Sequence, residues 1–259
     1  MRRVTEEMCS ASLSGPWCNA NPVTSSIMEA ISFITPALEN FFIRTVADGM
    51  PNKHHADLHQ RCVEFMFEEA SHTRAHALFN LRLLDYLQHA PPGLRPLQML
   101  LRALRKYAGP STRLFLVVAL EHFSTVLSKR YLTLHRDWKI ASPYAKTLFE
   151  LHAQEELGHR SVVFDLWTGD STRSGPARAV AVWSILFFGL LYICMAAPWI
   201  LHRKMHRKIL PTATAIFGYI MTRRPNVGAI RLLGELFSFA RKDYHPDNLI
   251  ATGLAFGGD

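Results

Sequence analysis

The sequence predicts an all-α protein, a four-helix bundle followed by an additional apolar helical region. Apolar side chains recur at helical spacing through long segments of residues 30–168, and prolines and glycines divide these segments from one another. Residues that favour helix starts stand at several of the divisions. With 49 % apolar and 19 % charged residues, the 259-residue chain can bury a sizeable core, which excludes a disordered or fibrous protein.

The expected helix boundaries follow from the residues that stand there. A proline follows Thr35 and another follows Ser142; both pairs suit the first turn of a helix, as does Ser111. A Pro-Pro-Gly sequence at residues 91–93 ends the second segment, and a shorter amphipathic stretch follows at residues 97–107. The four long helices are expected at residues 36–47, 56–88, 111–134 and 143–167.

The chain is expected to divide into three parts. Residues 1–29 form an N-terminal extension, residues 30–168 form the bundle, and residues 169–259 form an apolar and basic region with a tail. The four cysteines show no paired spacing, which argues against a disulfide scaffold and against a structural zinc knuckle. The N-terminal residues contain no continuous apolar stretch, so we expect no cleaved secretory signal.

Each of the four bundle helices carries an acidic residue on the face that should be apolar. A buried charge is costly unless it is compensated, so four inward acids need an explanation. In chain order the pattern is Glu, Glu-x-x-His, Glu, Glu-x-x-His, and residues three apart on a helix point to the same side. The candidate metal ligands are Glu39, Glu69, His72, Glu121, Glu156 and His159.

This pattern is the ligand arrangement of di-iron and di-manganese carboxylate bundles. Two divalent cations would neutralise the four carboxylates, which would otherwise repel one another in a dry core. Oxygen-rich ligation with one imidazole for each ion suits iron or manganese, so we expect two iron ions, with manganese as the alternative. The other interpretation is four solvent-exposed glutamates, above all for Glu39, which is expected close to a helix start.

Two further histidines fall on the ligand faces. His76 follows His72 by four residues, and His152 precedes Glu156 by four, so either is a candidate for an extra ligand or for the catalytic proton-transfer group. Both positions also suit a histidine that only orients a ligand. Asp165 is a candidate partner for the imidazole of a ligand histidine.

The bundle sequence resembles a bacterial family described as predicted metal-dependent hydrolases, which is similar in turn to the ferritin-like di-iron bundles. The resemblance covers about residues 25–170. It implies a ferritin-like four-helix bundle, the same six metal ligands, and His76 and His152 as further motif histidines. The stretches that carry it are residues 34–48, 65–80, 116–128 and 151–167, of which the last is the most specific.

The stretch at residues 179–201 is uncharged and, at about 1.5 Å for each residue, long enough to span a bilayer. Nine basic residues and no acidic one lie between residues 171 and 234, so the net charge of +8 is concentrated here. Such flanks suit anionic lipid headgroups, and no nucleic-acid recognition motif accompanies them. We therefore expect a membrane partner and no nucleic-acid partner.

We expect the membrane association to be peripheral or monotopic, on the cytoplasmic side, with residues 209–221 at the interface. A single membrane span at residues 179–201 is one alternative, and a helix buried in a soluble core is another. An active site close to lipid favours a hydrophobic or lipid-like substrate.

Three functions are compatible with these patterns. Our main expectation is an enzyme whose two iron ions activate dioxygen to oxidise the hydrophobic substrate, with a separate electron donor and with a homodimer as one compatible assembly. The first alternative is a two-metal hydrolase of an ester or phosphate, with His76 or His152 as the base. The second alternative is a helical membrane-surface protein without catalysis.

Overall fold

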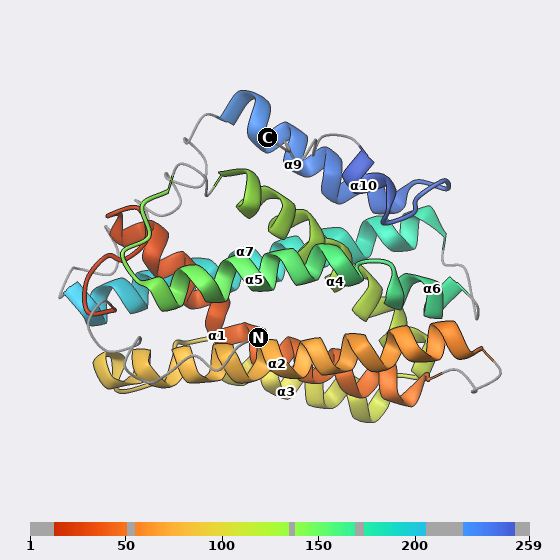
Figure 1. Cartoon of the computed structure of the whole chain (residues 1–259), viewed down its shortest axis with the longest axis horizontal. Helices are drawn as coiled ribbons and strands as arrows, with labels where there is room; N and C mark the ends of the chain where they lie inside the picture. Colours follow the sequence, from red (N-terminus) through yellow and green to blue (C-terminus); the bar gives the residue numbers. More distant parts are fainter. Residues whose placement is uncertain (1–12, 51–54, 135–137, 169–173, 206–224, 252–259) are drawn as a thin grey trace.

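The computed structural model describes residues 13–50, 55–134, 138–168, 174–205 and 225–251. Across these residues the secondary structure is helical, with no β-strand beyond one bridging pair, Cys18 and Ile140, which confirms the all-α prediction for the described chain. Helices α1 (Pro22–Asp48) and α2 (Ala56–Leu87) pack closely together, as do α4 (Pro110–Leu134) and α5 (Pro143–His159). Figure 1 shows these helices together with α7 behind α5.

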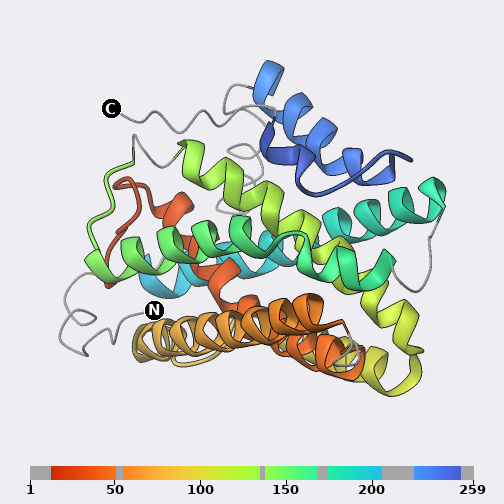
Figure 2. The same cartoon turned by 45° about the vertical axis from the view of Figure 1, so that its right-hand side comes forward.

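The remaining helices surround these four. Helix α3 (Leu94–Tyr107) connects α2 to α4 and packs on α1, and α6 (Val162–Thr168) follows α5. The C-terminal part consists of α9 (Pro225–Phe237), a 3-10 turn at Ser238–Ala240 and the short α10 (Asn248–Ala251). It lies beside α4 and α7, on the side of the molecule away from α2 and α3 (Figures 1 and 2).

The start of the first helix differs from the prediction at residue 36. Helix α1 begins at Pro22, because the side chain of Asn21 accepts hydrogen bonds from two backbone N–H groups of the first turn. Pro36 lies inside the helix, where its missing N–H leaves the carbonyl of the residue four positions earlier without its helical donor. That residue is Ser32, and its carbonyl oxygen instead accepts from Asn80 Nδ2 of α2 at 2.8 Å.

The other boundaries agree closely with the prediction, with one exception. The segment expected at residues 143–167 is two helices, α5 and α6, which are separated at residues 160–161. Arg61 of α2 donates to Ser161 Oγ at 2.9 Å and pairs with Asp165 at 2.8 Å, so it fixes the break and the start of α6 to α2. Residues 22–29 of the expected N-terminal extension belong to α1.

The apolar core forms two clusters, and the candidate ligands lie between them. On α1, Glu39 stands between Phe33 of one cluster and Phe42 of the other. On α2, the first Glu-x-x-His motif stands between Phe65 and Phe79 in the same way. The fold therefore places a layer of buried polar residues across the middle of an apolar interior.

The expected apolar stretch forms most of α7 (Gly175–Met205), which packs along α1. Tyr192 donates its hydroxyl to the carbonyl of Ala30 at 3.0 Å, so α7 is fixed to the bundle by polar as well as apolar contacts. Among the described residues α7 is the one helix long and apolar enough to cross a membrane, which alone is a weak indication of membrane association. The interfacial segment expected at residues 209–221 lies outside the described residues.

Candidate metal centre

The six predicted ligands come from α1, α2, α4 and α5, and all six side chains are buried, none of them more than 5 % exposed. The alternative of solvent-exposed glutamates is therefore wrong. Because an ionised carboxylate in an apolar interior needs compensating positive charge, four such groups in one layer require partners that the apolar core cannot provide. The six residues are Glu39, Glu69, His72, Glu121, Glu156 and His159.

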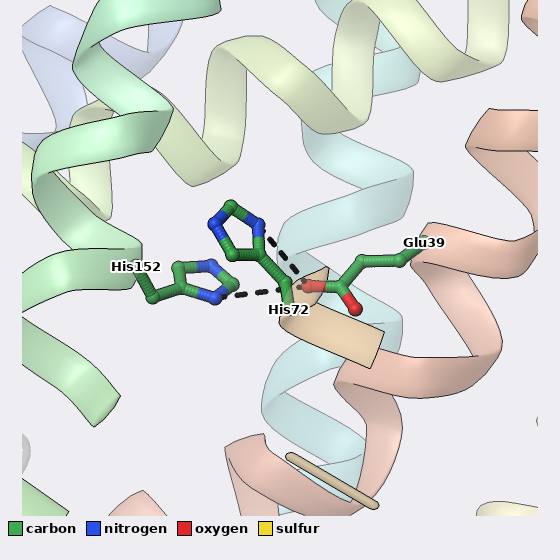
Figure 3. A group of neighbouring side chains, drawn as sticks. All are labelled: Glu39, His72 and His152. Carbon is green, nitrogen blue, oxygen red and sulfur yellow. Dashed lines mark ion pairs between the residues drawn. The ribbon is translucent and has the colours of Figure 1, made fainter. Parts of the chain in front are cut away.

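One group of three potential metal donors consists of Glu39, His72 and His152. Figure 3 shows the two imidazole rings turned toward the Glu39 carboxylate: Oε1 lies 3.8 Å from His72 Nδ1 and 3.7 Å from His152 Nδ1. Thr73 donates to the other Glu39 oxygen at 2.9 Å, which fixes the orientation of the carboxylate. The structure thus places His152, for which the sequence left several roles open, beside two predicted ligands.

The second group consists of Glu69, Glu156 and His159. His159 Nε2 lies 3.4 Å from Glu69 Oε1 and 3.6 Å from Glu156 Oε1. The same two oxygens also face the first group, at 3.6 Å and 3.9 Å from His72 Nδ1. Glu69 and Glu156 therefore lie between the two groups, where carboxylates could bridge two cations.

Glu121 belongs to neither three-donor group, although the sequence predicts it as a ligand. Both of its carboxylate oxygens are buried without a hydrogen-bond partner. Burial raises the pKa of Glu121 well above its usual range, and the charges of Glu156 and Glu69 add to this rise. Glu121 thus lies within electrostatic reach of the second group and has free donor atoms.

The side chains at this layer fit a pair of cations, because their donor atoms have no other partner. Buried polar atoms in proteins are nearly always hydrogen-bonded, so a cluster of unpartnered atoms points to a missing ion or ligand. Carboxylate oxygens with a few imidazoles are donors that suit iron and manganese. The unpartnered ligand atoms are Glu39 Oε1, both Glu69 oxygens, His72 Nδ1, both Glu121 oxygens, Glu156 Oε2 and both His159 nitrogens.

The protonation of the centre without metal supports the same conclusion. Burial raises the pKa of Glu39 well above its usual range, and the charge of Glu69 adds to the rise. Although burial favours neutral imidazole, the hydrogen bond to Glu155 and the nearby carboxylate of Glu69 raise the pKa of His72 to about 9. The metal-free centre therefore retains protons, which bound cations would displace.

Two glutamates outside the predicted ligand set orient the ligand histidines. His72 Nε2 lies 2.6 Å from Glu155 Oε2, and His159 Nδ1 lies 3.4 Å from Glu68 Oε2. Each imidazole thus faces a carboxylate on its outer side and keeps its other nitrogen for the centre, as is usual for metal-binding histidines. Each of these glutamates directly precedes the ligand glutamate of its own motif and orients the histidine of the other motif. Both motifs read Glu-Glu-x-x-His, and the first glutamate of each pair is the sequence signal for a carboxylate that orients a ligand histidine.

A chain of hydrogen bonds from α1 and α2 fixes the tautomer of His76. Asn80 Nδ2 donates to the Ser32 carbonyl, so Asn80 Oδ1 is the acceptor for the Ser32 hydroxyl at 2.7 Å. That hydroxyl has one proton, and Ser32 Oγ must therefore accept from His76 Nδ1 at 2.8 Å. Burial lowers the pKa of His76 well below its usual range, so the ring is neutral and its Nε2 is an acceptor.

The same chain determines which nitrogen of His152 faces the centre. His76 Nε2 accepts from His152 Nδ1 at 3.1 Å. Burial lowers the pKa of His152 to about 4, so the ring is neutral, and its free lone pair is on Nε2. This atom lies 3.4 Å from Glu156 Oε1. His76, with both nitrogens occupied, acts on the centre only through His152.

Asp165 does not contact a ligand histidine, so the role expected for it is wrong. Its carboxylate pairs with Arg61 at 2.8 Å and lies 3.6 Å from His245 Nε2. The break between α5 and α6 separates Asp165 from the helix that carries His159.

Comparison with known proteins gives one family. A family model described as a predicted metal-dependent hydrolase matches residues 1–249. No curated protein and no solved structure gives a significant match.

The central position of Glu156 predicts a loss of metal when it is removed. We expect Glu156→Ala to lower the metal content of the purified protein by at least about half, because this carboxylate belongs to the second group and also faces the first. Elemental analysis of the variant and the wild type measures the change. The control is Glu150→Ala, which removes a partly exposed glutamate of the same helix. Full metal content in Glu156→Ala would show that the carboxylate is not a ligand.

The raised pKa of His72 predicts how the stability of metal-free protein depends on pH. A pKa that is raised by folding stabilises the protein below the unfolded value of 6.5 and loses this effect as the pH rises through about 9. The raised pKa of Glu39 acts in the same direction. We expect the Tm after chelation to fall between pH 6.5 and 9, and added Mn²⁺ to reverse much of the fall. A Tm that is independent of pH in this range would contradict the assignment.

The contact between Glu155 and His72 predicts weaker metal binding when its charge is removed. We expect Glu155→Gln to lower metal affinity by roughly 10–100-fold, because a weaker, neutral acceptor replaces the charged carboxylate that orients the imidazole. Titration with Mn²⁺ measures the affinity, and Glu64→Gln, an exposed glutamate of α2, is the control. Equal affinities for the two variants would argue against this orienting role.

Proposed function

The chain belongs to the family of predicted metal-dependent hydrolases, and we propose that it hydrolyses an ester or phosphoester bond of a hydrophobic substrate with two divalent cations. The observation that carries the proposal is the buried layer of unpartnered carboxylate and imidazole donors, arranged as two adjoining groups.

The family corrects our main expectation from the sequence. We expected oxygen activation by two iron ions, and the family description names hydrolysis instead, which was the first alternative. The ligand pattern alone led to the wrong choice, because the same carboxylates and imidazoles hold metals in oxygen-activating and in other bundles. Without an oxidation, no electron donor is needed.

The donor geometry suggests how the cations would be held. Glu39 and His72 would hold one cation and His159 the other, with Glu69 and Glu156 between the two groups. Glu121, whose buried oxygens are unpartnered and feel the charges of Glu69 and Glu156, would add a ligand to the second cation. We propose Fe²⁺ or Mn²⁺, because oxygen donors outnumber the imidazoles and no thiolate takes part. Such a pair would act as Lewis acids that make a water molecule more acidic and polarise the substrate oxygen.

His152 is our choice for the group that takes the proton from the attacking water. The hydrogen-bond chain from Asn80 leaves a lone pair on Nε2, and the side chain is 15 % exposed while the predicted ligands are almost fully buried. A substrate that approaches from solvent would therefore meet His152 first. The low pKa of about 4 keeps this imidazole neutral and able to accept a proton at neutral pH.

The surroundings of the centre favour a hydrophobic substrate. Apolar clusters lie on both sides of the ligand layer, and they exclude bulk water from it. Phe65 packs against the His159 ring at a centroid distance of 4.9 Å, and Phe149 against His76 at 5.5 Å. Aromatic and aliphatic walls of this kind match an acyl or other apolar group better than a charged one.

The proposal predicts hydrolysis that depends on metal and not on oxygen. We expect Mn²⁺-loaded protein under nitrogen to cleave nitrophenyl esters, with a preference for long acyl chains, or bis-nitrophenyl phosphate. His152→Ala should lower kcat by about 100-fold or more with the metal content unchanged, because a general base is lost. Absence of turnover with both substrate classes, or turnover only with oxygen, would contradict the proposal.

A second variant tests the position of the base without removing it. Ser32→Ala deletes the acceptor for His76 Nδ1 and frees the tautomers of both histidines. We expect a kcat about tenfold lower at unchanged metal content. The matched control is Ser71→Ala, which removes an exposed hydroxyl bonded only to its own helix.

A further inference from the structure

The outward side of α7 is an unusually apolar surface for a described helix of this chain. Six large side chains lie along one side of the helix at intervals of three or four residues, apart from one adjacent pair, and each of them is between 40 and 64 % exposed. They cover about 15 residues, or roughly 22 Å of helix. Scattered apolar residues on a surface are ordinary, whereas a continuous stripe marks an interaction site. We define the α7 outer face by Val180, Trp183, Phe187, Phe188, Leu191 and Met195.

The opposite side of α7 is tied to the bundle by polar contacts along its length. Near its start, Arg178 donates to the carbonyl of Phe239 at 3.4 Å, and in the middle Tyr192 bonds to Ala30. Near its end, Lys204 Nζ lies 2.6 Å from the fully buried Glu29 Oε1. A helix that crossed a bilayer would leave the bundle and break these contacts, which would leave Glu29 buried without its cation.

Neither α7 nor α3 carries an acidic side chain. The sequence has no acidic residue from residue 171 to residue 234, and none between Asp85 and Glu121. The second of these stretches contains α3, and Gly93, the residue that precedes α3, lies beside Tyr192 and Met195 of α7. The exposed side chains of α3 include Arg95, Met99, Leu100, Arg102, Lys106 and Tyr107, which mix apolar and basic groups.

From these contacts and charges we propose that the α7 outer face docks on an anionic lipid membrane, with α7 parallel to the membrane surface. The apolar stripe enters the boundary between headgroups and acyl chains, and the exposed basic residues of α3 contact the headgroups. A second copy of the chain is disfavoured as the occupant, because two acid-free surfaces would face each other. This inference does not depend on the proposed function.

Vesicle binding by the full-length protein tests the proposal. We expect co-sedimentation with phosphatidylcholine vesicles that contain about 30 % phosphatidylglycerol, weaker binding at high salt, and little binding to pure phosphatidylcholine. Phe187→Gln with Phe188→Gln should weaken binding by at least about tenfold. The matched control is Phe67→Gln, which changes an equally exposed phenylalanine of α2. Equal binding by wild type and double variant would overturn the proposal.

Further measurements separate the competing occupants. Resistance of the membrane-bound protein to alkaline carbonate extraction would show a membrane span, and loss of a dimer in the double variant without vesicles would show a second copy; either result overturns the proposal. Quenching of Trp183 by brominated lipid, assigned by comparison with Trp183→Phe, tests the wild-type chain directly. We expect quenching by lipids brominated near the headgroups, and its absence would also overturn the proposal.

Discussion

Four carboxylates in one buried layer are the constraint on which the rest of this structure depends. Burial raises the pKa of Glu39, and the carboxylates of Glu155 and Glu69 raise that of His72 despite its burial, so protons provide the compensation where no metal is bound. A pair of cations would do so more strongly, because each brings two charges to donor atoms that have no other partner. The division of the apolar core into two clusters follows from the same layer, since neither cluster can extend through it.

Much of the fold was predictable because helical periodicity is a strong signal in long segments. The ends of α2 and α4 lie within a residue or so of the expected positions. The start of α1 was missed because Asn21-Pro22 and Thr35-Pro36 both have the sequence signature of a first turn, and Pro36 lies instead in the helix interior. What keeps it there is tertiary structure, namely the bond from Asn80 of α2.

The candidate site was predictable to the extent that its chemistry is local to one helix. The Glu-x-x-His spacing identifies residues that share a face, and all six predicted ligands are buried in one layer. Contacts between helices could not be predicted from helical spacing. The hydrogen bond between Glu155 and His72 joins two helices and was not expected, and the expected contact between Asp165 and a ligand histidine is absent. The ligand pattern also could not distinguish hydrolysis from oxygen activation, and the family description corrected the expected reaction class.

Pro36 has a consequence for how the helices are aligned. The carbonyl that it leaves open on Ser32 has one matching donor, the Asn80 amide, and this donor stands on α2 one turn from His76. Sliding α1 along α2 by a turn would leave a buried carbonyl and a buried amide both unpaired, a double penalty that apolar packing alone does not impose. The missing hydrogen bond of α1 thus fixes the register of α1 against α2. This register determines the level along the bundle at which Glu39 lies beside the other ligands.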